Sequence, residues 1–258
     1  MNPAILTTIK KLIYFLYLGT IFSCLSIHGI DIDSSKDESV ALCPNFTPPE
    51  NWELVDPKLL SPSVIVGYVD KSKIGFLPSM NLAVEKVNVS LSKYVQEVKK
   101  LYQQNKINRW RDLGIITTKA GKARLTEVDT KNKWGDVRIL QLIFLKNQTA
   151  YILTTSAKKE DFHNFYLSIQ KSLLSFDLGD DVYSFVEDEK LPTLKQEVTH
   201  LKHDLLSLEE KDPDFPNPWI TFDNFIKNNH ANLGSFWYTQ IINLLKNETS
   251  EERKGKDA

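Results

Sequence analysis

Residues 137–176 read VRILQLIFLKNQTAYILTTSAKKEDFHNFYLSIQKSLLSF, and this stretch decides the fold class. Residues 137–145 are apolar on both faces of a strand, and only Arg138 and Gln141 interrupt the pattern. A strand that is apolar on both faces is typical of the centre of a sheet whose two sides are both covered. The pattern therefore predicts a central strand with structure packed above and below it.

The second half of the stretch predicts another strand and a helix that covers the sheet. Residues 146–148 have the chemistry of a turn, and residues 150–155 follow as a second strand. Residues 158–174 then carry apolar side chains at helical spacing. The expected buried stripe of this amphipathic helix consists of Phe162, Phe165, Tyr166, Ile169 and Leu173.

The chain before residue 137 shows the same alternation of strand and helix signals. Five further strands are expected at 52–55, 64–69, 81–89, 113–118 and 123–129. A helix with Ser90 or Ser92 as its N-cap is expected between the third and fourth of these strands. The order of strands, helix, antiparallel meander and helix predicts an α+β fold, in which helices flank an antiparallel sheet of about six strands.

This layout resembles the PsbP/DcrB-like domain family over residues 46–178. The residues that carry the resemblance are Pro49-Glu-Asn-Trp52-Glu-Leu, Val87-Asn-Val89 ahead of Ser92, and Tyr151-Ile-Leu-Thr-Thr-Ser-Ala157 ahead of the last helix and Ser175-Phe176. The resemblance implies an α/β/α sandwich. It also implies an exported or lipid-anchored accessory or assembly protein, and it brings no catalytic signature.

The first 29 residues have the pattern of an export signal. Lys10 and Lys11 precede an apolar run at residues 12–25, and no acidic residue occurs before Asp31. A short cationic region followed by about 7–15 apolar residues is typical of a secretory signal peptide. The run is shorter than the roughly 20 apolar residues that a membrane-spanning helix needs. We therefore expect export, followed by a polar tether at residues 30–45.

Two endings of this signal fit the sequence. Ile21-Phe22-Ser23-Cys24 resembles a bacterial lipobox, in which Cys24 is lipidated and anchors the protein to an envelope membrane, although Phe22 departs from the pattern. The alternative is ordinary cleavage before Ile27 or after Gly29, which would leave a periplasmic protein without a lipid anchor.

Charge is distributed unevenly along the chain. Residues 46–179 contain 20 Lys and Arg against 13 Asp and Glu, whereas residues 180–258 contain 9 against 16. This asymmetry indicates either a basic surface for an anionic partner or an acidic extension that docks on its own domain.

The C-terminal part is expected to be a helical extension over residues 180–248, followed by a disordered tail at 249–258. Its first helix has an apolar seam at Leu191, Leu194, Val198, Leu201, Leu205 and Leu208, which packs on the domain or on the next helix. Residues 222–245 form the last helical stretch.

Basic and aromatic residues are interleaved in one part of the chain. The candidate contact patch consists of Arg109, Trp110, Arg111, Lys122 and Arg124. The expected partner is another envelope protein or an anionic surface, and the membrane is reached through the signal or its lipid. Nucleic acid is not expected as a partner of an exported protein.

A metal-dependent enzyme is the alternative to a binding protein. Glu160-Asp-Phe-His163 and Glu197-Val-Thr-His200 are both E-x-x-H motifs, and Asp204 lies four residues after His200. On a helix this spacing places a carboxylate and an imidazole on one face, as in the cores of di-metal bundles. Such sites need four helices, and ordinary solvated helix faces give the same spacing. We therefore expect a non-enzymatic protein without cofactor.

Overall fold

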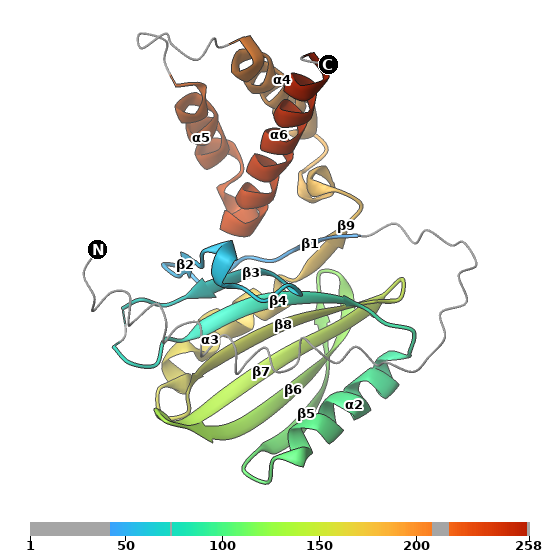
Figure 1. Ribbon diagram of the computed structural model, residues 1–258, viewed down its shortest axis with the longest axis vertical. Helices are drawn as coiled ribbons and strands as arrows, with labels where there is room; N and C mark the ends of the chain where they lie inside the picture. The colour runs from blue at the N-terminus through green and yellow to red at the C-terminus, as the bar shows by residue number, and fades with distance from the viewer. Residues whose placement is uncertain (1–41, 73, 208–216, 257–258) are drawn as a thin grey trace. The chain divides into compact units, whose positions relative to one another are not determined.

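The computed structural model describes residues 42–72, 74–207 and 217–256 (Figure 1). The expected signal segment with Cys24, and the tether up to residue 41, lie outside these residues. The described part of the chain holds no helix that combines the length and the apolar character needed to cross a membrane. It divides into two compact units. One is Pro48–Asp177, and the other joins Leu42–Thr47 to the described residues from Leu178 onward.

The first unit is built on a seven-stranded sheet in which all neighbouring strands are antiparallel. The order across the sheet is β2-β3-β4-β8-β7-β6-β5. The strands are β2 (Glu53–Leu54), β3 (Val64–Val69), β4 (Ser79–Lys86), β5 (Arg109–Thr118), β6 (Gly121–Asn132), β7 (Gly135–Lys146) and β8 (Thr149–Lys158). The predicted α+β class is confirmed, and β7 is a central strand as its sequence predicts.

Strands β5 and β6 are longer than their sequences predict. β5 begins at Arg109, four residues before the expected start at 113. The extension exists because Arg109 and Trp110 lie opposite Asp129 and Val128 of β6, so that the ladder runs almost to the end of both strands. All five residues of the candidate basic patch are consequently strand residues.

Helix α2 (Leu91–Gln104) covers one face of the sheet, here called the α2 face. Its N-cap is Ser90, whose hydroxyl accepts a hydrogen bond from the Lys93 amide at 3.3 Å. Val95, Val98 and Tyr102 are buried in a core cluster with side chains of the central strands, and Trp110 packs against the same cluster.

Helix α3 (Phe162–Leu174) lies on the opposite face, the α3 face (Figure 1). It begins four residues later than predicted, because β8 continues to Lys158. Phe162, Phe165, Ile169 and Leu173 are buried as expected. Tyr166 is 46% exposed, which corrects its place in the predicted stripe. The buried arc extends from Ile169 towards Ser172, so Tyr166 lies at its rim.

The second unit combines a two-stranded sheet with helices. Its elements are β1 (Cys43–Asn45), β9 (Asp177–Gly179), η2 (Val182–Phe185), α4 (Leu191–Ser207), α5 (Pro218–Asn229), η3 (Ala231–Leu233) and α6 (Gly234–Lys256), while the short η1 (Pro57–Leu59) belongs to the first unit. Leu194, Val198 and Leu201 of α4 form a core with Trp237 and Ile241 of α6. The apolar seam of α4 as far as Leu205 therefore packs on helices of its own unit, and Leu208 lies outside the described residues.

Three expectations for this second unit are wrong. Cys43–Asn45 is a strand rather than tether, and Gln240 holds it by accepting a hydrogen bond from the Cys43 thiol at 3.0 Å and donating one to the Pro44 carbonyl at 3.1 Å. The stretch 222–245 is two helices, separated where Gly234 adopts a φ of +85°. Helix α6 also continues to Lys256, through residues that were expected to be disordered.

Tertiary contacts explain the long α6. Thr249, near the end of the helix, is buried at 9% exposure. Lys202 of α4 pairs with Glu248 at 3.2 Å and with Glu252 at 2.5 Å. These contacts on neighbouring helices stabilise a segment whose charged composition alone indicates disorder.

Candidate functional site

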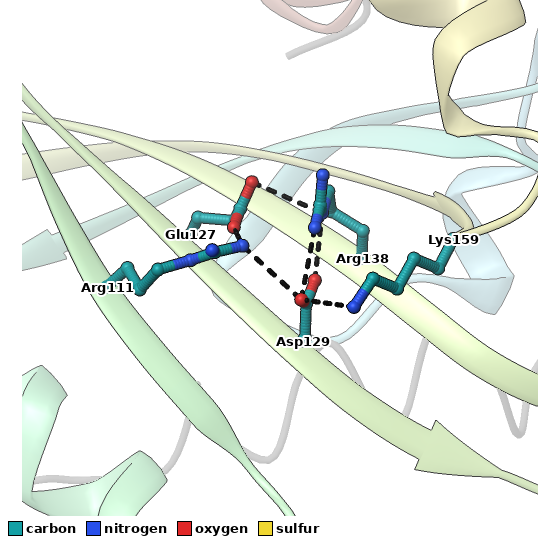
Figure 2. A network of polar contacts seen from close by, with 5 residues as sticks. All are labelled: Arg111, Glu127, Asp129, Arg138 and Lys159. Carbon is teal, nitrogen blue, oxygen red and sulfur yellow. Dashed lines mark hydrogen bonds and ion pairs between the residues drawn. The ribbon is translucent and has the colours of Figure 1, made fainter.

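A network of five charged residues lies on the α3 face of the sheet (Figure 2). Arg111 comes from β5, Glu127 and Asp129 from β6, Arg138 from β7, and Lys159 from the turn after β8. The register of the sheet brings them together, because Arg111 lies directly opposite Glu127 and Asp129 lies directly opposite Arg138. The guanidinium of Arg138 also lies 5.6 Å from the ring centre of Phe162 in α3, which places the network on this face.

Both carboxylates of the network have several cationic partners. Asp129 contacts Arg138 Nε at 2.8 Å, Lys159 Nζ at 2.8 Å and Arg111 Nη2 at 3.3 Å. Glu127 contacts Arg138 Nε at 3.2 Å and also pairs with Arg111 Nη2. The side chains of Glu127 and Asp129 are only 9% and 12% exposed, whereas that of Arg111 is 53% exposed. The acidic centre of the network is therefore buried beneath its basic rim.

The environment of Asp129 shifts its pKa strongly. Burial by itself raises the pKa of this carboxyl, since it disfavours the charged form. Hydrogen bonds from Arg138 and Lys159 favour the charged form and outweigh burial, so that the pKa falls to about 2. Asp129 is accordingly ionised at neutral pH.

The chemistry of this network is that of a structural clamp. Three cations surround two carboxylates, and no member of the network is a histidine, thiol or hydroxyl. Its contacts join β5, β6 and β7 to the turn that leads into α3. What remains accessible at the rim is positive charge, carried by Arg111 and Lys159.

A second ion pair joins β5 to β6 on the α2 face. Arg124 Nε contacts Asp112 Oδ1 at 2.7 Å, and a second contact joins Arg124 Nη2 to Asp112 Oδ2. These hydrogen bonds lower the pKa of Asp112, because the bidentate guanidinium favours the carboxylate. Asp112 also accepts a hydrogen bond from the Gly114 amide at 2.9 Å.

The structure divides the five residues of the candidate basic patch between both faces of the sheet. Arg111 belongs to the α3 face and is paired in the network, while Arg124 is paired on the α2 face. Trp110 packs on the α2 face, where the Lys99 ammonium lies 5.6 Å from its ring centre. Arg109 and Lys122 are exposed and form no ion pair with any described residue.

The residues of the metal alternative are placed in two different units. Glu160 lies in the turn before α3 rather than in a helix, so the helical spacing expected for Glu160 and His163 does not occur. The Glu160 carboxylate lies 3.4 Å from Lys158 Nζ, and His163 Nδ1 lies 3.0 Å from the Glu160 carbonyl oxygen.

The second motif does lie on a helix. Glu197, His200 and Asp204 belong to α4, where His200 Nε2 lies 3.6 Å from Asp204 Oδ2. Within the described ranges, no group of three or more His, Cys, Asp and Glu side chains is arranged to hold a metal ion.

Sequence reasoning missed Glu127, Asp129 and Lys159. The one signal for them is Arg138, a charged residue in an otherwise apolar central strand. A buried cation needs a carboxylate partner, so Arg138 indicates that such a partner exists. Only the strand register identifies it as Asp129.

Comparison with protein-family models and with curated protein sequences gives no match. Among solved structures, LpqN of Mycobacterium tuberculosis, described as involved in cell envelope biogenesis, is similar at a TM-score of 0.42 and 11% identity, over 56% of this chain and 87% of that one. The cyanobacterial PsbP protein of Synechocystis is similar at a TM-score of 0.37 and 10% identity, over 59% and 99%.

The Ran-binding protein Mog1p of Saccharomyces cerevisiae is similar at a TM-score of 0.32 and 16% identity, over 49% of this chain and 94% of that one. The likeness to a PsbP protein that the sequence suggests thus recurs among solved structures. These are similarities of fold at low TM-score, and the functional argument therefore rests on the residues of this chain.

Proposed function

We propose that this chain is an exported, envelope-associated accessory protein that acts by binding another protein and not by catalysis. The signal pattern of the first 29 residues supports export. Of the carboxylates in the metal motifs, Glu160 pairs with Lys158 and Asp204 with His200. The buried carboxylates of the network, which no motif indicated, are held by arginine and lysine.

The observation that carries the binding role is the composition of one edge of the sheet. Strand β5 ends the sheet order, and its surroundings contain both free cations and exposed aliphatic side chains. We call this surface the β5 edge; its residues are Lys106, Ile107, Arg109, Leu113, Ile115, Lys119 and Lys122. The aliphatic members Ile107, Leu113 and Ile115 are 58%, 45% and 59% exposed. Its four cations form no ion pair with any described residue.

This combination is typical of a contact surface for an acidic protein. Exposed aliphatic side chains gain free energy when a partner buries them, and unpaired cations around them favour a partner of opposite charge. The proposed anchoring at Cys24 would hold the protein close to the membrane, because lipidated proteins stay at the bilayer when several acyl chains are attached.

Export and membrane attachment are tested on the intact protein. A fusion of the chain to alkaline phosphatase is expected to be active only when residues 1–29 are present. Intact mass of the mature protein separates lipidated Cys24 from simple cleavage before Ile27. An enzyme activity of the fusion that does not depend on residues 1–29 would contradict export.

The binding role is tested by site-specific photo-crosslinking in the cells that make the protein. A photoreactive residue at Ile115 should give a discrete crosslinked product. The matched control is the same residue at Ile65 of β3, an aliphatic position that is 46% exposed and separated from β5 by four strands of the sheet. Equal products at both positions, or no product at Ile115, would overturn the β5 edge as the contact surface.

A further inference from the structure

We propose that the partner binds as an extended segment that adds to the outer edge of β5, with acidic residues on both sides of an apolar centre. This inference rests on the proposed binding function and makes it specific. It concerns the backbone of β5 as well as its side chains, and it identifies the partner by its charge and conformation.

The backbone of β5 is available for pairing along its outer side. β5 is paired with β6 on one side and is the last strand of the described sheet on the other. Of its ten residues, only Thr118 is buried. An edge strand in this state offers unpaired N–H and C=O groups, which is the template on which extended peptides add as a new strand.

The charges at this edge select an acidic partner. The acids closest to β5 in the sheet register are already neutralised, Asp112 by Arg124, Glu127 by Arg111 and Asp129 by Arg138. The cations Lys106, Arg109, Lys119 and Lys122 are not neutralised by any described residue. The edge therefore presents an excess of positive charge on both sides of Leu113 and Ile115.

The same charges argue against a second copy of this chain as the occupant. If two β5 strands paired antiparallel about Gly114, Arg109 of one copy would lie opposite Lys119 of the other. Like charges directly opposite each other destabilise a strand pair. A segment with acidic residues at these two positions would form two attractive pairs instead.

The irregularity in β5 fits this selectivity. The register with β6 shifts between Asp112 and Gly114, where Gly114 has a φ of +96°. Bulges and lysines are the devices by which natural edge strands avoid indiscriminate pairing. The unpaired charges at this edge are all positive. Pairing with a second copy of β5 or with a neutral strand is therefore less favourable than pairing with an acidic strand.

The test uses the mature protein and a synthetic peptide, Asp-Glu-Thr-Val-Thr-Val-Thr-Val-Glu-Asp, followed by NMR. Peptide binding should shift the amide signals of β5 and slow their hydrogen exchange. A peptide with Lys in place of each acid should bind at least about tenfold more weakly, which is a 1.4 kcal/mol difference. A peptide that is N-methylated on alternate residues loses backbone donors and should also bind at least about tenfold more weakly.

Variants locate the effect on the protein. Lys119→Glu/Lys122→Glu should weaken binding of the acidic peptide at least about tenfold. The matched control Lys58→Glu/Lys86→Glu makes the same change in net charge at exposed positions beside β3 and on β4, which at least three strands separate from β5, and should leave binding within about twofold. Equal binding of the methylated peptide, or equal effects of the two double variants, would overturn strand addition.

Crosslinking separates this inference from the binding function itself. Neighbouring residues of a strand point to opposite faces of the sheet, and a strand beside β5 lies close to both sets. Photoreactive residues at Ile115, Ile116 and Thr117 should therefore all crosslink the partner. Products from Ile115 and Thr117 alone would leave the binding function intact and refute strand addition. Tighter association with vesicles of phosphatidylcholine and phosphatidylglycerol than with the acidic peptide would also refute it.

Discussion

The buried polar residues of β6 have opposite environments on the two faces of the sheet. On the α3 face, Glu127 and Asp129 each contact at least two cations. On the α2 face, the neighbouring residue Thr126 is fully buried, and its hydroxyl has no hydrogen-bond partner among the described residues. Thus the carboxylate of Glu127 is paired, whereas the hydroxyl of Thr126, one position before it on β6, is unpaired among the described residues.

The unpaired groups of the α2 face are close together in the register. Thr126 lies opposite Gln141, and Gln141 lies opposite Thr154, to whose hydroxyl it donates a hydrogen bond at 3.4 Å. Gln141 Oε1 and Trp110 Nε1 are also buried without a partner in the described part of the chain. Buried polar groups in this state cost free energy, so the α3 face stabilises the sheet and the α2 face contains its weak points.

The comparison teaches that burial of a polar residue is informative only together with its register. A carboxylate that is nine-tenths buried is well satisfied where the opposite strand supplies a guanidinium. The equally buried hydroxyl of Thr126 has no partner among the described residues, because the side-chain NH2 of Gln141 opposite it donates to Thr154. The following predictions test this difference, beginning with the apolar cover of the α3 face.

Removal of the Phe165 ring should have the largest effect. Phe165 is 9% exposed and packs edge-on against Trp52, with the ring centres 6.2 Å apart. Phe165→Ala should lower the free energy of unfolding of the first unit by about 3–5 kcal/mol, because it removes buried area and leaves a cavity. Leu167→Ala, at a 77% exposed position, should cost less than about 0.5 kcal/mol. Urea titration measures both, and similar losses would show that α3 does not cover this face.

Removal of the central cation should have the next largest effect. Arg138→Leu leaves the buried carboxylates of Glu127 and Asp129 with only the more exposed Arg111 and Lys159 as cationic partners among the described residues, and we expect a loss of about 3 kcal/mol. Arg111→Leu removes a side chain that is 53% exposed, so its loss should stay below about 1 kcal/mol. If the two variants unfold at the same urea concentration, the contribution of an arginine to stability does not increase with its burial in this network, and the prediction is wrong.

The network should also make stability depend on pH in the acid range. The folded-state pKa of Asp129 is about 2, below the ordinary value near 3.8 that applies in the unfolded chain. Its contribution to stability is therefore complete above about pH 4 and is lost as the pH falls through about 2. Thermal unfolding at several pH values should show this loss, and Asp129→Asn should remove that part of the dependence. If Asp129→Asn shows the same dependence of thermal stability on pH as the unmodified protein, Asp129 is not the source of that dependence.

The smallest effect is expected on the α2 face, and it has the opposite sign. Thr126→Val replaces an unpaired buried hydroxyl by a methyl group of nearly the same shape, and should raise the free energy of unfolding by about 1 kcal/mol. Thr154→Val is the matched control, because it removes the acceptor of the Gln141 hydrogen bond and should lower stability. A destabilised Thr126→Val would mean that its hydroxyl has a partner, such as an ordered water.

Much of the fold was predictable because it depends on local chemistry. The apolar run of β7, the Ser90 cap and the spacing of Phe162, Phe165 and Ile169 each act within one element. The site was less predictable. Of the five residues in the buried network, only Arg111 was among the expected contact residues, and it was expected to be free.

Element ends show the same division. The sequence predicted a helix from residue 158, yet β8 continues to Lys158 because its last residues pair with β7. The charged residues of α6 gave no helix signal, and contacts between Lys202 and Glu248 extend the helix through them. In both cases a partner from elsewhere in the chain outweighed the local preference.

The sequence by itself determined the type and order of the main strands and helices of the first unit and the sign of charge in each half of the chain. It did so because side-chain periodicity and capping act over a few residues. Only the tertiary structure decided that Arg111 and Arg124 are neutralised while Arg109 and Lys122 stay free. That outcome depends on the register between β5 and β6 and on the shift at Gly114, since moving a strand by one residue exchanges its two faces.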